Sequence, residues 1–152
     1  MNISDLLNVN GDMQAEKNKA DKLVALNEKT AEYGLTLTEK DALEIVRSHR
    51  ETLGLTDRIE VGDGIVGTII ERFSKSPYID KWSYKETITE LIAIFYRFKN
   101  ETEDIVADGE LLSVMKNAFD GECNGSLELL ENKFLPEYAE KVRRDFYGRS
   151  GL

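Results

Sequence analysis

The stretch that most constrains the fold is residues 84–98, which read YKETITELIAIFYRF. Apolar residues recur there at spacings of three and four, which is typical of a helix buried along one face. That face consists of Tyr84, Ile88, Leu91, Ile92, Phe95 and Phe98, and it is widened by Ile94 and Tyr96. So wide an apolar face needs cover on several sides, so we expect this segment to be a central, nearly buried helix.

Helical spacing continues through most of the remaining chain, beginning with a helix expected at about residues 13–33. Side chains suited to N-caps precede the later apolar periods at Thr38, Asp63, Asp108 and Ser126, and Ser83 with Glu86 has the spacing of a capping box. Glycines that could end helices stand at positions 34, 54, 121 and 148, and Pro136 suits a first helical turn.

Little in the sequence favours β-structure. Residues 58–61 (RIEV) are a candidate strand without an evident partner, and two prolines in 152 residues argue against a turn-rich β-sandwich. Residues 1–12 are expected to be a frayed lead-in. The sequence therefore predicts a single all-α domain over residues 1–152, a bundle of six to seven helices with short loops.

Negative charge is concentrated in residues 101–140. This segment has eleven Asp and Glu against two Lys, so it alone accounts for the net charge of −9 of the chain. An acidic field repels phosphate backbones and attracts basic surfaces, so we expect a protein partner with a basic surface and no nucleic acid. No apolar run is long enough for a membrane span, residues 1–12 do not resemble a secretory signal, and one cysteine suits a cytoplasmic protein.

Residues 120–131 (DGECNGSLELLE) have the spacing of a twelve-residue EF-hand loop. In such a loop alternate side chains converge on one calcium ion, and a central glycine, here Gly125, allows the sharp turn. The candidate metal ligands are Asp120, Asn124, Glu128 and Glu131.

Three features of this segment depart from an EF-hand. Glu122 stands where a shorter Asp or Asn is expected, Pro136 follows soon after the loop, and no second loop has a suitable spacing. A simpler structural interpretation is a turn at Asn124 and Gly125 followed by an N-cap at Ser126. Calcium binding and this turn remain alternatives.

No catalytic constellation is evident. One His and one Cys exclude a zinc cluster or a disulfide framework, and His49 is expected to be a boundary residue with one hydrogen bond. Residues 62–67 (GDGIVG) match G-x-G-x-x-G, but Asp63 would repel a pyrophosphate and no βαβ sheet is expected. We therefore expect these glycines to allow a tight turn and a close contact with a helix. We assign no catalytic residue and no cofactor other than the candidate calcium ion.

Several longer segments resemble a family of small proteins from low-GC Gram-positive bacteria that is described only as a domain of unknown function. These segments are YGLTLT, RIEVGDGI, SPYI, ETITELIAIFYRFKNET and FDGECNGSLELL, which together extend from Tyr33 to Leu130. The resemblance implies no activity, cofactor or catalytic residue. It does imply that the loop before GSLELL lacks the acidic and amide pattern in relatives, which argues against calcium.

The sequence thus favours a non-enzymatic, cytoplasmic module that acts through protein–protein contact, with an acidic surface at residues 101–140. Two alternatives stay open. One is a degenerate EF-hand-like calcium-binding module at residues 120–131, and the other is an acidic inhibitor that mimics nucleic acid. The sequence leaves the oligomeric state open.

Overall fold

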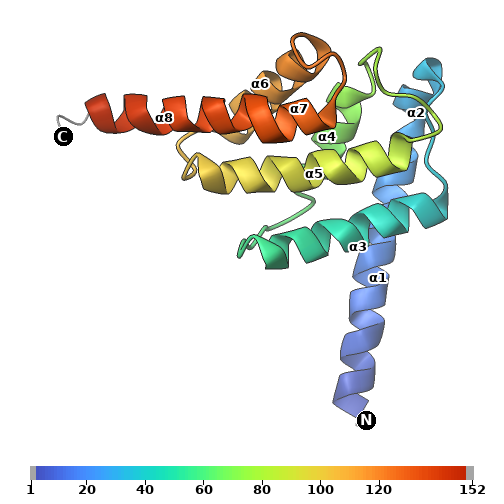
Figure 1. Ribbon diagram of the computed structural model, residues 1–152. Coiled ribbons are helices and arrows are strands. Elements are labelled where there is room, and N and C mark those ends of the chain that lie inside the picture. Colours follow the sequence, from blue (N-terminus) through green and yellow to red (C-terminus); the bar gives the residue numbers. More distant parts are fainter. Residues whose placement is uncertain (1–2, 150–152) are drawn as a thin grey trace.

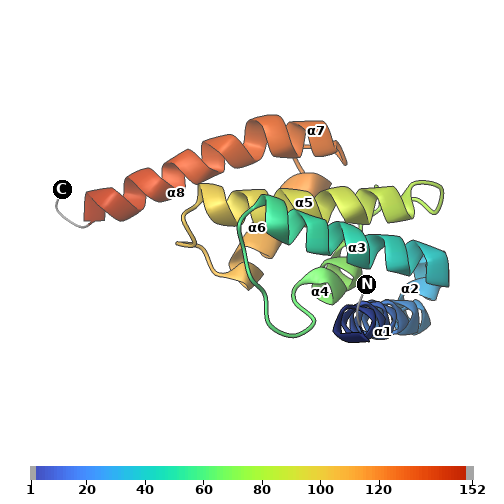
Figure 2. The same cartoon turned by 90° about the horizontal axis from the view of Figure 1, so that it is seen from below.

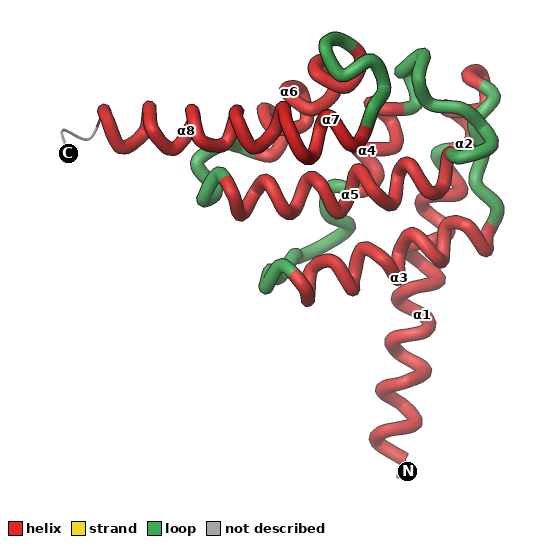
Figure 3. The backbone as a smooth tube through the Cα atoms, in the orientation of Figure 1, coloured by secondary structure: helices red, strands yellow, loops and turns green. Residues whose placement is uncertain are grey.

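The computed structural model describes residues 3–149, and this part of the chain is helical and contains no strand (Figure 3). The helices are α1 (Ile3–Ala25), α2 (Asn27–Thr30), α3 (Glu39–Leu55), α4 (Val66–Phe73), α5 (Tyr84–Glu101), α6 (Asp108–Asp120), α7 (Leu127–Leu129) and α8 (Leu135–Arg149). A 3-10 turn (Ala31–Tyr33) follows α2, and a π-helical turn (Leu130–Phe134) joins α7 to α8. The predicted all-α bundle with short loops is confirmed.

Helix α5 lies at the centre of the bundle, as the sequence predicts. It contacts α3, α4, α6 and α8 (Figure 1). All eight of its predicted apolar residues are buried, namely Tyr84, Ile88, Leu91, Ile92, Ile94, Phe95, Tyr96 and Phe98. Burying one such side chain contributes roughly 1.5–3 kcal/mol relative to leaving it in water, so this helix supplies much of the core.

Helix α1 crosses the bundle instead of lying along it. Figure 2 views α1 nearly end-on beside α3, and in Figure 1 its first turns extend beyond the other helices. Glu16 of α1 holds α3 through Arg47 at 2.9 Å and Arg50 at 3.0 Å. Residues 3–12, expected as a lead-in, are helical, while residues 1–2 lie outside the described part.

The helix expected at residues 13–33 is divided. Helix α1 ends at Ala25, and α2 and the 3-10 turn follow, up to Gly34. The side chain of Asn27 accepts from the backbone N–H of Leu37 and donates to the carbonyl of Leu37, both at 2.9 Å. This side chain therefore fixes the path into α3. Gly34 ends the run with φ of 76°, as predicted.

The predicted helix caps are partly confirmed. Thr38 caps α3 in a capping box with Asp41, and Ser126 accepts from the backbone N–H of Leu129. Asp63 and Asp108 are not caps, because α4 and α6 have Ile65 and Ala107 at the N-cap position.

The capping box predicted from Ser83 and Glu86 is wrong. Ser83 occupies the N-cap of α5, but its side chain makes no capping bond. Asp80 Oδ1 accepts instead from the backbone N–H groups of Trp82 and Ser83, at 2.8 and 2.9 Å. A carboxylate outside the helix thus satisfies donors next to its start.

Pro136 lies in the first turn of α8, as predicted, yet the chain remains helical before it. The π turn at Leu130–Phe134 continues into α8, and the backbone N–H of Leu135 donates to the carbonyl of Leu130. A proline inside a helix removes an N–H donor and crowds the preceding turn, and a π turn is a local way to accommodate it. Among the described residues, no helix has the length and apolar character needed to cross a bilayer.

Candidate functional site

Residues 55–61, which we call the apolar segment, connect the end of α3 to the loop before α4. Three large apolar side chains of this segment face solvent, with exposed fractions of 80% for Leu55, 97% for Ile59 and 94% for Val61. Arg58 and Glu60 contact the bundle instead. The alternation at residues 58–61 resembles that of a strand, but the chain forms none here.

Arg58 forms the first anchor of the apolar segment. Its guanidinium makes a bidentate pair with Asp104, at 2.7 and 3.2 Å, and donates to Asn100 Oδ1 at 2.7 Å. The Arg58 guanidinium also lowers the pKa of the Asp104 carboxyl group. Asn100 in turn donates to the carbonyl of Thr56 at 2.9 Å. The apolar segment is thereby fixed to the end of α5.

Glu60 forms the second anchor, together with His49 of α3 and Tyr96 of α5. Tyr96 Oη donates to Glu60 Oε2. His49 Nε2 lies 3.1 Å from Tyr96 Oη and 2.8 Å from Glu60 Oε1. The hydroxyl has a single proton, which it gives to Glu60, so it accepts from His49 and Nε2 must carry a proton. We call these three residues the His49–Glu60–Tyr96 cluster.

Burial and contacts act in opposite directions on the acidity of this cluster. Burial raises the pKa of Glu60, but the contacts with His49 and Tyr96 and the charges of His49 and Lys19 outweigh it, so the pKa of Glu60 is lowered. Burial, reinforced by the neighbouring Glu60 carboxylate, raises the pKa of the Tyr96 hydroxyl far above its usual value. At neutral pH the cluster therefore contains a carboxylate and a neutral phenol.

The loop at Gly62 and Gly64 gives the Glu60 carboxylate its space. Both glycines have positive φ, 82° and 68°. A Cβ atom at Gly64 would lie 1.7 Å from Glu60 Oε1, which is buried and lies 2.8 Å from His49 Nε2. These glycines thus permit the tight turn that we predict, although the close contact at Gly64 is with a carboxylate and not with a helix.

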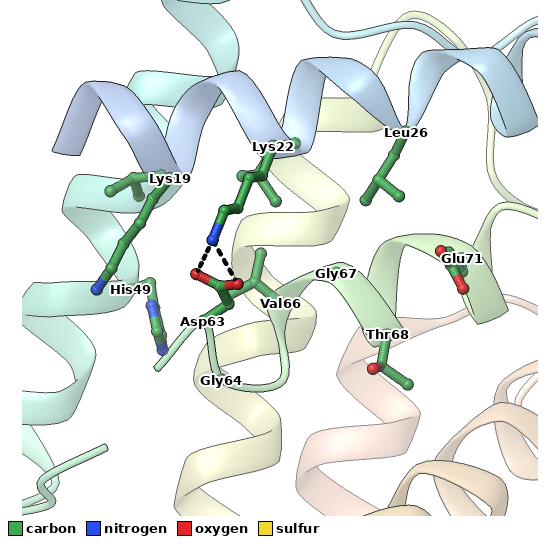
Figure 4. A pocket seen from close by; sticks show the side chains of 12 residues that line it. Lys19, Lys22, Leu26, His49, Asp63, Gly64, Val66, Gly67, Thr68 and Glu71 are labelled. Atoms are coloured by element: carbon green, nitrogen blue, oxygen red, sulfur yellow. Dashed lines mark hydrogen bonds and ion pairs between the residues drawn. The ribbon is translucent and has the colours of Figure 1, made fainter. Parts of the chain in front are cut away.

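A pocket of about 260 Å³ lies between α1, α3 and the loop that leads into α4. In Figure 4, Lys19 and His49 stand at one end of this pocket and Leu26 and Glu71 at the other. An ion pair between Lys22 of α1 and Asp63 of the loop, with an N–O distance of 2.8 Å, bridges the middle. Asp63, predicted as a helix cap, therefore serves as a link between the loop and α1.

The structure separates the predicted calcium ligands into different contacts. Asp120 accepts from Ser76 at 2.5 Å and pairs with Lys116, and Glu131 pairs with Arg97 of α5 at 3.3 Å. Asn124 Oδ1 lies 3.4 Å from Tyr78 Oη. Within residues 3–149, the carboxylates of Asp120, Glu128 and Glu131 form no group that could hold a metal ion. Calcium binding at residues 120–131 stays a prediction.

The surface formed by residues 101–140 is less acidic in the folded protein than a charge count of this segment predicts. Five of its carboxylates form ion pairs, and four of the five cations come from outside residues 101–140. The pairs are Arg143–Glu101, Arg58–Asp104, Lys99–Asp108, Lys116–Asp120 and Arg97–Glu131. Helix packing thus brings basic residues from α5, α8 and the apolar segment onto this surface.

Other residues that could carry chemistry are buried or lie apart from the cluster. Cys123 is a buried thiol whose pKa is raised by burial and by the neighbouring Glu122. The Trp82 side chain is 84% exposed, and Lys81 Nζ lies 4.7 Å from its ring centroid. We expect His49 to be a boundary residue with one hydrogen bond. Its side chain is instead buried, with 6% exposed, and it contacts two polar groups. Neither partner could be deduced from the sequence, since Tyr96 reads as core and Glu60 as part of a polar loop.

Comparison with known proteins identifies the family of the chain. No curated protein and no solved structure matches it. A model of a family of unknown function, DUF6323, matches residues 22–148, which include the apolar segment, the His49–Glu60–Tyr96 cluster and all of α3–α7. The match spans most of the chain, which therefore belongs to the DUF6323 family of unknown function.

Proposed function

We propose that this protein acts by binding another protein through its apolar segment. The observation that carries the proposal is the exposure of Ile59, Val61 and Leu55 within seven consecutive residues. Single exposed apolar residues are ordinary on protein surfaces, whereas a contiguous apolar patch is typical of an interaction site. Burying each of these side chains against a partner would contribute roughly 1.5–3 kcal/mol before the cost of association.

The two anchors of the apolar segment support this proposal. Arg58 is tied to Asp104 and Asn100, and Glu60 is tied to His49 and Tyr96. A segment held in place before binding loses less conformational entropy when it binds. The His49–Glu60–Tyr96 cluster accordingly has a positioning role in this proposal, and we assign it no reaction.

The charge near the apolar segment favours a partner whose apolar surface is bordered by basic residues. Asp57, within the segment, is exposed, and Asp104 remains more than half exposed although Arg58 binds it. The chain as a whole carries a net charge of −9. Complementary charge at the rim speeds association and selects among partners, while the apolar contacts supply most of the affinity.

The experiment compares the wild-type chain with a variant that carries both Ile59→Ser and Val61→Ser. Both side chains face water, so the variant should keep its melting temperature. Tagged wild-type protein should recover a stoichiometric protein at low salt from lysate of the source organism, and the double variant should lose that protein.

The matched control is Trp82→Ser, which removes an exposed apolar side chain far along the chain from the apolar segment. This control should retain the partner. Identical recovery by the wild type and the double variant would overturn the proposal. Light scattering of the purified chain, with and without the two substitutions, tests whether the partner is a second copy.

A further inference from the structure

We propose that the pocket between α1, α3 and the start of α4 binds a small monocarboxylic acid with an apolar body. Apolar side chains from three elements line this pocket, namely Leu23, Leu26, Val46 and Val66. Their position beside the ammonium groups of α1 creates an amphipathic space, which suits a ligand with an apolar body and one charged end.

The charges of the pocket indicate the sign of that end. Lys19 and Lys22, one turn apart on α1, both line the pocket. Lys22 pairs with Asp63, and the carboxylate of Glu71 pairs with Lys29. Among the described residues, the ammonium group of Lys19 makes no ion pair or hydrogen bond. Its charge acts on Glu60 only at longer range.

The unmatched ammonium of Lys19 favours a single negative charge on the ligand. A carboxylate at the end of the pocket near Lys19 and His49 would complete an ion pair there (Figure 4). A dianion such as a phosphate monoester would add a second charge close to Asp63 and Glu60, which disfavours it.

The volume of the pocket limits the size of the ligand. About 260 Å³ is smaller than the roughly 300–1,000 Å³ of sites for drug-sized molecules. The apolar wall continues from Val46 to Leu26, so the body of the ligand would extend along α1 beneath the Lys22–Asp63 pair. That pair is more than half exposed, so a ligand could displace it at little cost.

The experiment titrates the purified full-length chain with hexanoate and, separately, with hexanamide, which has the same apolar body and no charge. Methyl resonances of Leu26, Val46 and Val66 report on the pocket in two-dimensional NMR spectra. We expect saturable shifts of these methyl groups with hexanoate, and about tenfold weaker binding of hexanamide. Absence of saturable shifts, or equal affinity for the acid and the amide, would overturn the proposal.

Two variants locate the ligand. Lys19→Met should abolish the preference for hexanoate over hexanamide. The control is Lys17→Met, which lies on the same helix but outside this pocket and should leave the preference unchanged. Gly67→Leu should block both ligands, because Gly67 lines the pocket and a Cβ atom there would already contact Leu26 Cδ1 at 3.7 Å, so a larger side chain would fill this end of the pocket. Gly54→Leu, with open space around its Cβ, is the matched control. An equal effect of Lys17→Met and Lys19→Met would also overturn the proposal.

Discussion

Gly64 and Glu60 are placed so that the backbone of the first leaves space for the carboxylate of the second. A Cβ atom at Gly64 would lie 1.7 Å from Glu60 Oε1, so any other residue there must push the carboxylate away from His49 and Tyr96. Gly62, two residues earlier, also has positive φ but has no atom within 4 Å of the corresponding Cβ position. Substitution of Gly62 therefore causes backbone strain alone, whereas substitution of Gly64 also displaces the Glu60 carboxylate.

We expect Gly64→Ala to lower the free energy of unfolding by about 2–4 kcal/mol, because it combines left-handed backbone strain with lost contacts of Glu60. Gly62→Ala should cost only about 1–2 kcal/mol, from the strain alone. Chemical denaturation measures both values. In a Glu60→Ala background the excess cost of Gly64→Ala should disappear. An equal cost of Gly64→Ala with and without Glu60 would contradict the contact.

The lowered pKa of Glu60 predicts a pH dependence of stability. A carboxyl group with a lower pKa in the folded state stabilises the fold above its unfolded pKa of about 4.3, and this contribution is lost as the pH falls through the folded value. Glu60→Gln should therefore reduce the free energy of unfolding by about 1–2 kcal/mol at pH 7, with the difference narrowing below about pH 5. Urea denaturation at several pH values between about 3 and 7 measures this difference in the free energy of unfolding.

Glu51→Gln is the control for this pH series. Glu51 is exposed on α3 and forms no ion pair among the described residues, so its substitution should have little effect at any pH in the series. A difference between the wild type and Glu60→Gln that stays constant from pH 7 to pH 3 would show that the charge of Glu60 is not involved.

The helices could be predicted because periodicity and apolar content are local properties of the sequence. The central position of α5 follows from the width of its apolar face, and Gly34 and Thr38 mark helix ends through backbone and side-chain chemistry that acts within a few residues. The His49–Glu60–Tyr96 cluster could not be predicted in this way. It joins residues 36 and 47 positions apart, and no local pattern links them.

The charge of the surface at residues 101–140 also depends on contacts between residues that are distant in the sequence. Residues 101–140 carry the whole net charge of the chain in sequence, but Arg58, Arg97 and Arg143 reach this surface from other elements. A charge count along the chain therefore overstates the acidity of the folded surface. The exposure of the apolar segment could not be predicted for a related reason, since RIEV reads only as a candidate strand without an evident partner.

Substitutions at Asp80 and Glu86 test which carboxylate stabilises the start of α5. Asp80 accepts two backbone N–H groups, and these bonds lower the pKa of its carboxyl group. Asp80→Ala should lower the melting temperature by about 2–4 °C, because two backbone N–H groups next to the helix start would lose their acceptor. Glu86→Ala should have less than half that effect, because Ser83 and Glu86 form no capping box. Scanning calorimetry at pH 7 compares the two variants, and a larger effect of Glu86→Ala would restore the capping box.

Calcium provides the last test, because the contacts of residues 120–131 oppose its binding. A calcium ion held by Asp120 and Glu131 would first have to release Lys116 and Arg97 from these carboxylates. It would also have to draw together carboxylates that the fold keeps apart. A ligand that binds the native state raises its melting temperature. We therefore expect equal melting temperatures in millimolar calcium and in sodium chloride of the same ionic strength. A rise specific to calcium that Glu131→Gln abolishes would instead establish the EF-hand interpretation, and it would show that the two ion pairs open when the ion binds.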